Sequence, residues 1–435
     1  MILKFSIQRI VIAFLSVVST SAINAQQILP VDLETVLKLA GANNLTVKEY
    51  QLKYQQAIAD QIKAKEWWLP DIYAGFTTHY LNGAAMNTDG KIYTDINRNN
   101  IWAGLGVAAE IDFSKGKYTL LAGKQKAAAI NYQSLAERNK AILAAVEAYF
   151  DLQAEQLQYL FLRHLVGQSD TLSQQIKVQV DAGILYQSDY LLSQSNYNHL
   201  KISMLQAKGD WQMKSAMLAS LLNMGSNISL ISADTSLAPL ELKKQIIDTT
   251  SLTSGFTKRP EYLGLNAELQ SFETGRKTAN EGLLLPKLRV GLDNGAFGAY
   301  AGPVQSTYQL NGALIWKLPF GRLSYKGDLK QWDAKIAIQN NKLEQFQNQY
   351  REEVTIATAQ LQIADAQIAI AKEALRSSEE SLDQSIERQK LGTAKPFEVF
   401  QAQQFYVQAQ LDYFKSVAAY NKAQYGLKVA LGEAL

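Results

Sequence analysis

Two stretches of the chain alternate between apolar residues and polar or small residues, which is the pattern of β-strands with one apolar face. The clearer stretch covers 101–113, and the second covers 306–320. Each is preceded by a partner with weaker alternation, over 71–82 and 287–298. Each of the four has the roughly 9 to 11 residues that a tilted β-strand needs to cross a membrane. The pattern therefore predicts two pairs of membrane strands.

Long segments without proline separate these pairs of strands. The eight prolines leave 71–238 and 320–395 uninterrupted, so very long helices are possible there. A first helix is indicated by the periodicity of 31–66. The predicted long helices and the helices that follow them cover 114–182, 184–225, 323–391 and 395–432. At 1.5 Å per residue the longest would be a rod on the order of 100 Å.

A seven-residue repeat of apolar positions runs through the second long helix. The large members are Val354, Leu361, Ile368, Leu375 and Leu382, and the small residues three positions later are Ala357, Ala364, Ala371 and Ser378. This heptad pattern predicts a coiled-coil seam at which neighbouring helices approach closely. The first long helix carries a looser stripe, at Leu143, Val146, Phe150, Leu157, Phe161, Leu165, Leu172 and Ile176. The remaining helix surface is polar, as expected for a face in water.

The whole arrangement occurs twice. Pro70 and Pro286 precede the strand pairs, and Gly183 and Gly392 follow the long helices; these and other equivalent landmarks are separated by 207 to 216 residues, about half of the chain. Such spacing predicts a tandem duplication. We place the first repeat at 26–225, a linker region at 226–259 and the second repeat at 260–435.

The hydrophobic content of 47% does not come from spanning helices, because mean hydropathy is only -0.14. One apolar run lies at the start of the chain. Lys4 and Arg9 precede Ile10–Val18, and small residues lead to Ala25. Residues 1–25 are therefore predicted to be a secretory signal peptide; an uncleaved anchor helix would need a longer apolar run.

The composition excludes several classes of function. The chain has no cysteine, so disulfides, thiolate metal sites, cysteine nucleophiles and an acylated lipoprotein N-terminus are excluded. A formal net charge of +3 provides no electrostatic footprint for nucleic acid. The histidines His79, His164 and His199 share no metal-ligand spacing.

Other chemical signals are weak. Gly104-Leu105-Gly106 loosely matches a dinucleotide fingerprint, but it lies inside a predicted strand. The segment 83–98 contains Asn87, Asp89 and Asp95, yet lacks the calcium-loop spacing, and we expect a polar loop. A copper-export interpretation is open for Met204, Met213, Met217 and Met224, although a helical packing face is the better explanation. With no catalytic pattern either, we expect no enzyme activity and no cofactor.

Four strands are too few to form a closed barrel, and open sheet edges are not tolerated in hydrocarbon. Membrane barrels start at about 8 strands, so at least two copies of the chain must contribute. A shared barrel continued by long helices predicts a channel. The alternative is an exported, non-conducting coiled-coil scaffold of the cell envelope, which fractionation with soluble periplasmic proteins would support.

The sequence resembles the TolC-like outer membrane factors, the exit ducts of tripartite efflux pumps and type I secretion systems. The resemblance covers nearly all of the predicted mature chain. It rests on the opening segment 31–44, the two Leu-Pro strand entries, the segments 182–189 and 391–399, and the closing YGLKVALG at 425–432. It implies a mainly α-helical homotrimer with a shared 12-stranded β-barrel in the outer membrane, a helical barrel across the periplasm, and an equatorial region near 226–259.

The resemblance also implies where functional residues lie. The expected partners are a periplasmic adaptor and an inner-membrane transporter. The adaptor would contact the turns at the periplasmic tip of the helices, at Gly183, Ser188, Gly392, Thr393 and Ala394. Asp189 and Glu398 match acidic positions that would form a charged, cation-favouring constriction. Ala394 and Gln401 depart from the family, which often has a basic and an acidic residue there. Independently of the resemblance, aromatic residues in or beside the strands are candidates for the lipid interface, with core packing the alternative: Trp68, Trp102, Tyr308 and Trp316.

Overall fold

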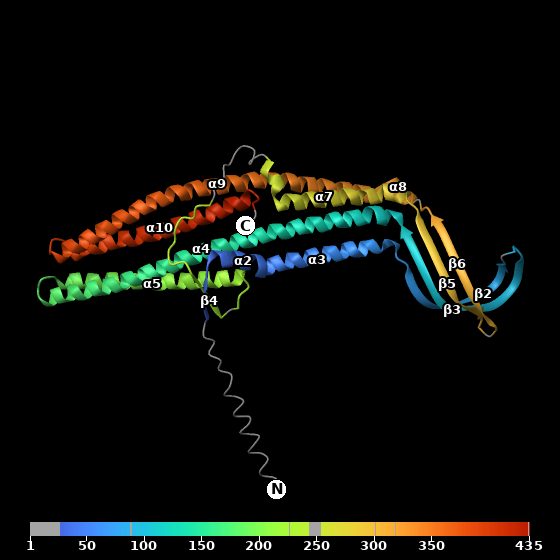
Figure 1. The fold of residues 1–435 in the computed structure, drawn as a ribbon, viewed down its shortest axis with the longest axis horizontal. Helices are drawn as coiled ribbons and strands as arrows, with labels where there is room; N and C mark the ends of the chain where they lie inside the picture. Colours follow the sequence, from blue (N-terminus) through green and yellow to red (C-terminus); the bar gives the residue numbers. More distant parts are fainter. Residues whose placement is uncertain are drawn as a thin grey trace, which may run out of the picture. The chain divides into compact units, whose positions relative to one another are not determined.

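A computed structural model describes residues 27–87, 89–225, 227–242, 254–300, 302–317, 319–433 and 435 (Figure 1). The predicted signal peptide, 1–25, lies outside these residues. The chain divides into two compact units. The first contains the described parts of 27–48, 137–242 and 351–435, and the second those of 49–136 and 254–350.

Helices dominate both units. The α-helices are α2 Leu33–Asn43, α3 Leu45–Lys65, α4 Leu120–Asp181, α5 Gln187–Leu221, α7 Pro260–Ala279, α8 Phe320–Tyr325, α9 Gly327–Lys390 and α10 Pro396–Ala430. The strands are β1 Gln27–Val31, β2 Asp71–Met86, β3 Ile92–Asp112, β4 Ile228–Ser232, β5 Lys287–Ala299 and β6 Val304–Ile315. Short turns of helix are η1 Glu66–Trp68, η2 Lys115–Thr119, η3 Gly255–Lys258 and η4 Glu281–Leu284. The predicted mainly helical class with a four-stranded sheet segment is confirmed.

The first long helix is close to its predicted extent, whereas the second starts later than predicted. η2 is π-helical and leads into α4, which has 62 residues. The predicted helix 323–391 is interrupted at Lys326, whose φ of 52° ends α8, so that α9 begins at Gly327. A left-handed residue cannot continue a right-handed helix, which explains the break. Every helix in the described residues is too short or too polar to cross a bilayer.

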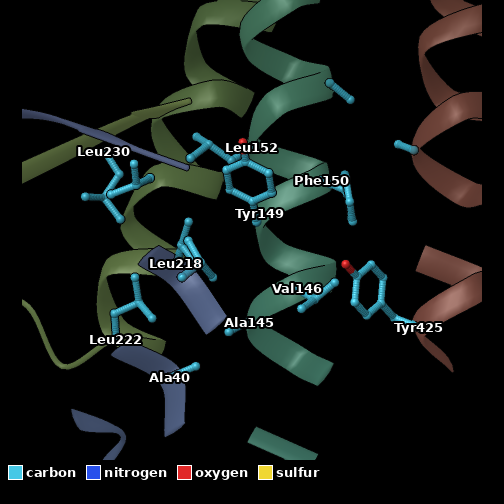
Figure 2. Packing of buried hydrophobic residues seen from close by; sticks show 14 of the residues in the cluster. Ala40, Ala145, Val146, Tyr149, Phe150, Leu152, Leu218, Leu222, Leu230 and Tyr425 are labelled. Carbon is cyan, nitrogen blue, oxygen red and sulfur yellow. The ribbon is translucent and has the colours of Figure 1, made fainter. Parts of the chain in front are cut away.

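The core of the first unit surrounds the middle of α4 (Figure 2). Its apolar side chains meet α2, α5, β4 and α10, including Ala40, Val146, Phe150, Leu218, Leu222, Leu230 and Tyr425. Val354, Ala357, Ala364, Ala371 and Leu382 of the predicted α9 seam are buried. The apolar stripes therefore form narrow contacts between neighbouring helices. Each helix buries only one stripe of its surface, so no wide core is enclosed.

The first unit contains a small parallel sheet that the sequence pattern does not predict. It joins the start of the described chain to the predicted linker region 226–259. β1 pairs with β4, with Leu29 opposite Leu230. Glutamine side chains of α4 hold the residues after Leu230: Gln156 Oε1 accepts from the Ser232 N–H at 2.7 Å, and Gln153 Nε2 donates to the Ser236 carbonyl at 3.0 Å. The predicted linker 226–259 therefore contains an ordered segment.

Two amide side chains of α10 bind the next part of this segment. Asn421 Nδ2 donates to the Ala238 carbonyl at 3.0 Å, and its Oδ1 accepts from the Leu240 N–H at 2.8 Å. Gln424 Nε2 donates to the Leu240 carbonyl at 2.8 Å, and its Oε1 accepts from the Leu242 N–H at 3.1 Å. The two side chains thus present to the main chain the same donors and acceptors as the edge of a β-strand.

The second unit contains an antiparallel sheet with the strand order β2-β3-β5-β6. Residues that alternate along each strand separate the sheet into two faces. The apolar face carries, among others, Ile72, Phe76, Leu105, Val290, Tyr308, Leu310 and Leu314, and all of these are exposed. The opposite face is polar and rich in glycine. Within the described part of the chain, no further strand pairs with the outer edges of β2 and β6.

The first strand pair is longer than predicted. The expected loop over 83–98 is mostly strand, since β2 continues to Met86 and β3 starts at Ile92. Asn87 closes the turn: its Oδ1 accepts from the Lys91 N–H at 2.8 Å, and its N–H donates to the Lys91 carbonyl at 3.0 Å. The register shifts between Gly83 and Ala85, which accommodates a bulge. The predicted strand 306–320, by contrast, ends at Ile315.

Candidate functional site

The turns between α4 and α5 and between α9 and α10 have the same backbone design. Gly183 has a φ of 76° and Gly392 a φ of 72°. The Ile184 N–H donates to the Gln179 carbonyl at 2.8 Å, and the Thr393 N–H donates to the Arg388 carbonyl at 2.9 Å. These are the hydrogen bonds of a Schellman motif, which ends a helix with a left-handed glycine. The two predicted turn glycines therefore occupy equivalent positions that disfavour other residues.

The two predicted acidic residues start the helices that follow these turns. Asp189 is the third residue of α5, and its Oδ2 accepts from the Tyr186 N–H at 3.1 Å. Glu398 is the third residue of α10, and its Oε1 accepts from the Lys395 N–H at 3.3 Å. A carboxylate at this position satisfies a free N–H and interacts favourably with the helix dipole. Both residues thus have a structural role in addition to any role in a charged ring.

Glu398 also has a cationic partner across the turn. Its Oε2 lies 3.5 Å from Arg388 Nη1. The carbonyl of Arg388 in turn accepts hydrogen bonds from the Thr393 hydroxyl at 3.1 Å and from the N–H groups of Thr393 and Ala394. Position 394 lacks a basic residue, and Arg388, for which the local sequence offers no signal, supplies a positive charge from the preceding helix.

Large apolar side chains are exposed at both turns. Ile184 is 72% exposed, Tyr186 81%, Leu391 76% and Phe397 57%. Ser188 is exposed beside them. A cluster of this kind on a water-facing turn indicates a contact surface for another protein. We call these four apolar residues the tip patch.

Buried polar contacts hold the two hairpins together behind the tip patch. Asn196 Nδ2 donates to Gln403 Oε1 at 2.7 Å, and Gln389 Nε2 donates to Gln179 Oε1 at 3.4 Å. A small apolar cluster of Leu382, Val399 and Ala402 packs beside them. Because these contacts link α4 and α5 to α9 and α10, the two turns belong to one surface of the first unit.

A charged cluster lies further along the same helices. Asp151 of α4 accepts from Lys214 Nζ of α5 at 2.9 Å and from Lys422 Nζ of α10 at 2.6 Å. Burial favours a higher pKa for Asp151, but the two ammonium groups hold the pKa below its ordinary value. The carboxylate therefore ties three helices together. No local pattern indicates this cluster, because the three residues are far apart in the chain.

Glu155, one turn further along α4, is in the opposite situation. Its Oε2 is buried, and the described residues offer it no hydrogen-bond partner. Burial, with a smaller contribution from the nearby Asp210 carboxylate, raises the pKa of Glu155. Burial of this kind destabilises the charged form of the carboxylate.

The predicted interface aromatics lie in different environments. Tyr308 is on the apolar face of β6 and is 67% exposed. Trp68, in η1 before β2, and Trp316, directly after β6, are 53% and 58% exposed. Trp102 is on the polar face of β3, so it does not share the surface that carries Tyr308. The expected methionine packing face is formed only in part: Met224 packs against the core of the first unit, whereas Met213 and Met217 are 59% and 58% exposed.

No metal site is found in the part of the chain that the structure describes, where no group of three or more His, Asp or Glu side chains could hold an ion.

Comparison with known proteins shows the fold. No protein-family model matches the chain, and no curated protein has a significantly similar sequence. Solved structures do match. The CmeC outer membrane channel of Campylobacter jejuni is 18% identical, with a TM-score of 0.74 over 92% of this chain and 85% of that one. The MtrE outer membrane channel of Neisseria gonorrhoeae, in its open state, is 15% identical, with a TM-score of 0.74 over 92% and 89%. A membrane protein of Pseudomonas aeruginosa is 16% identical, with a TM-score of 0.77 over 94% and 92%. The chain therefore has the fold of solved outer-membrane channels.

Proposed function

We propose that the chain is a subunit of a TolC-like outer membrane factor, a passive exit duct of a tripartite efflux pump or a type I secretion system. The observation that carries the proposal is the four-stranded sheet. It has one exposed apolar face, one polar face and two unpaired edges among the described residues, and it occurs in a chain whose fold is that of outer-membrane channels.

This sheet is incomplete as a membrane structure. Its apolar face suits the hydrocarbon of the outer membrane, but its open edges do not, because unpaired backbone groups are costly there. Three copies would supply 12 strands and close the edges against one another. The apolar face would then contact lipid, and the polar face would line a pore.

Part of the helix surface is also left without an apolar partner among the described residues of one chain. On α9, Ile356, Ile363 and Ile370 recur every seven residues and are 47%, 58% and 72% exposed. This second heptad stripe is distinct from the buried seam at Val354 and Leu382. A stripe of this kind is suited to a helix of another copy, so it supports a homotrimer whose helices extend into the periplasm.

The tip patch is the proposed contact for a periplasmic adaptor. Its apolar side chains, with Ser188, Thr393 and Ala394 beside them, could pack against the adaptor's own helices. The energy and the choice of cargo would come from the inner-membrane transporter, since a passive duct needs neither a catalytic centre nor a cofactor.

Conductance tests the proposal. Purified trimer in a planar bilayer should conduct ions, and absence of conductance from an intact trimer would refute the channel. Fractionation tests the location: the protein should sediment with outer membranes. Recovery as a soluble periplasmic protein would instead favour the exported coiled-coil scaffold. Photo-crosslinking from Leu391 and Ile184 should capture an adaptor, whereas the same probe at exposed Asn198 should not.

A further inference from the structure

Aromatic side chains lie on the polar face of the sheet, where water-facing residues are expected. In one row across the strands, Tyr73 of β2 is opposite Gly106 of β3, which is opposite Asp293 of β5. Two rows away, Trp102 of β3 is opposite Phe297 of β5. Tyr73 and Phe297 are 39% and 49% exposed. Exposed aromatic rings on the otherwise polar face require an explanation.

Glycines form the surface on which two of these rings lie. Gly75, Gly104 and Gly295 are side by side on adjacent strands, between the rows of Tyr73 and Trp102. A Cβ at Gly104 would be 2.9 Å from Trp102 Cζ2, and a Cβ at Gly75 would be 3.2 Å from Trp102 Cζ3. The indole therefore lies over both glycines, and one side of the ring is directed away from the sheet.

Tyr73 is held in the same manner. A Cβ at Gly106 would overlap the Tyr73 ring, so the ring crosses β3 only because position 106 has no side chain. The Tyr73 hydroxyl donates to Asp293 Oδ1 on the far side. This hydrogen bond fixes the ring and orients the carboxylate next to it.

The charge beside Tyr73 is negative, whereas Arg98 lies on the same face two rows beyond Trp102. Asp71 and Asp293 both share the polar face with Tyr73, and no basic side chain among the described residues forms an ion pair with either. Nearer the helices, Glu110 and Asp112 are neutralised by Lys287 and Arg289, at 2.8 to 3.1 Å. The acidic charge beside Tyr73 is thus not paired with a basic side chain in the described residues, whereas the rows of Glu110 and Asp112 are neutral.

We propose that Trp102, Tyr73 and Phe297, with Asp71 and Asp293, form a binding patch for planar organic cations on the pore-lining face of the sheet. A flat aromatic cation stacks on the ring faces and gains from both their quadrupoles and the two carboxylates. The inference rests on the proposed function, because it takes the polar face to line the pore. It assigns to the duct a weak site that favours one chemical class of cargo.

The rings could alternatively serve only to cover the glycines and stabilise the strands. Asp293→Asn separates the two roles, since asparagine keeps an oxygen that accepts from Tyr73 but removes the charge. Trp102→Leu removes the larger ring. Tyr308→Leu is the matched control, an aromatic-to-leucine change on the apolar face of the same sheet.

The experiment measures the binding of ethidium, a planar aromatic cation, to full-length protein by fluorescence anisotropy. The protein is nuclease-treated and solubilised in detergent. We expect saturable binding to wild type and to Tyr308→Leu, and binding about tenfold weaker to Trp102→Leu and Asp293→Asn. The neutral analogue phenanthridine should not compete at similar concentration. Equal ethidium affinity in wild type and Asp293→Asn, or no saturable binding to wild type, would overturn the inference.

Conductance of the same preparation is recorded in planar bilayers, where ethidium should reduce the current of wild type more than that of Asp293→Asn. Because anisotropy does not depend on conductance, the two proposals can fail separately. A protein that conducts but does not bind ethidium contradicts the patch alone. A protein that binds ethidium but does not conduct contradicts the duct. If Trp102→Leu does not assemble, Asp293→Asn, which keeps the packing, decides the result.

Discussion

Asn196 of α5 and Gln403 of α10 form a 2.7 Å hydrogen bond between side chains that are 207 residues apart and only 7% and 4% exposed. This separation matches the offset between the two repeats of the sequence. The contact therefore joins corresponding helices of the two halves through polar groups, in a region where a purely apolar seam would be the simpler solution. Its contribution to stability can be measured directly.

Asn196→Leu should lower the free energy of unfolding by about 1–3 kcal/mol, because it leaves the Gln403 amide buried and unpaired. The double change Asn196→Leu with Gln403→Leu should recover much of the loss, since no polar group is then left unpaired. Urea unfolding at fixed protein concentration measures both. Asn198→Leu, on the exposed side of α5, is the control. A single variant as stable as wild type would show that the pair is not important.

The charges at the tip should be tested without disturbing the helix starts. Asp189→Asn with Glu398→Gln keeps the oxygens that accept from Tyr186 and Lys395, whereas alanine would remove these caps. If the two carboxylates line a constriction, the double variant should lower the cation-to-anion permeability ratio, by about twofold or more. Reversal potentials in a salt gradient measure this ratio. Asp412→Asn, exposed on α10, should not change it, and an unaltered ratio in the double variant would show that the constriction lies elsewhere.

Gly183→Ala and Gly392→Ala should each destabilise the protein by about 1 kcal/mol, because alanine resists the left-handed backbone at φ of 76° and 72°. Gly209→Ala is the matched control. Gly209 lies inside α5, and a Cβ there meets no atom within 4 Å, so the change should stabilise by up to about 1 kcal/mol. Thermal unfolding monitored by circular dichroism distinguishes the two directions. Equal effects at all three positions would contradict the role of the turns.

Glu155→Gln should stabilise the protein near neutral pH, by about 1 kcal/mol, because it removes a buried charge whose Oε2 has no partner in the described residues. The pKa of Glu155 is raised in the folded state above the ordinary value of 4.5. Between these two values the folded state binds more protons than the unfolded state, so wild-type stability falls as pH rises through this window.

The glutamine variant should lack this part of the pH dependence. Unfolding free energies at several pH values between 4.5 and 8 measure the difference between the two proteins. Glu344→Gln, on the exposed surface of α9, should follow the wild-type curve. If the unfolding free energies of wild type and Glu155→Gln depend on pH in the same way, Glu155 does not titrate in this window.

Local patterns located the strands and the turn glycines, but not the ends of the strands. Alternation located β3, β5 and β6 because one side of each strand is apolar. It failed for 92–100, where Asp95, Asn97 and Asn99 accompany Ile92 and Tyr93. Much of this part of β3 projects beyond its pairing with β5, so the hairpin is covered less and neither face has to be apolar.

Contacts between distant segments could not be predicted in the same way. Arg388 and Glu398 approach only because the turn at Gly392 reverses the chain. Asp151 meets Lys214 and Lys422 only through the packing of three helices. In the sequence each of these residues is an ordinary charged position on an amphipathic helix, and nothing in its neighbourhood identifies its partner.

The pairing of Asn421 and Gln424 with residues 238–242 has a consequence for which substitutions the connection between the repeats tolerates. The two amides bind the carbonyls of Ala238 and Leu240 and the N–H groups of Leu240 and Leu242, so they recognise main-chain atoms only. Pro239, which has no N–H, falls at a position where none is used, and Glu241 is exposed. Related chains should therefore vary freely at 239 and 241 while retaining the amides at 421 and 424. The residues that must be kept for this contact lie in α10, not in the segment that α10 binds.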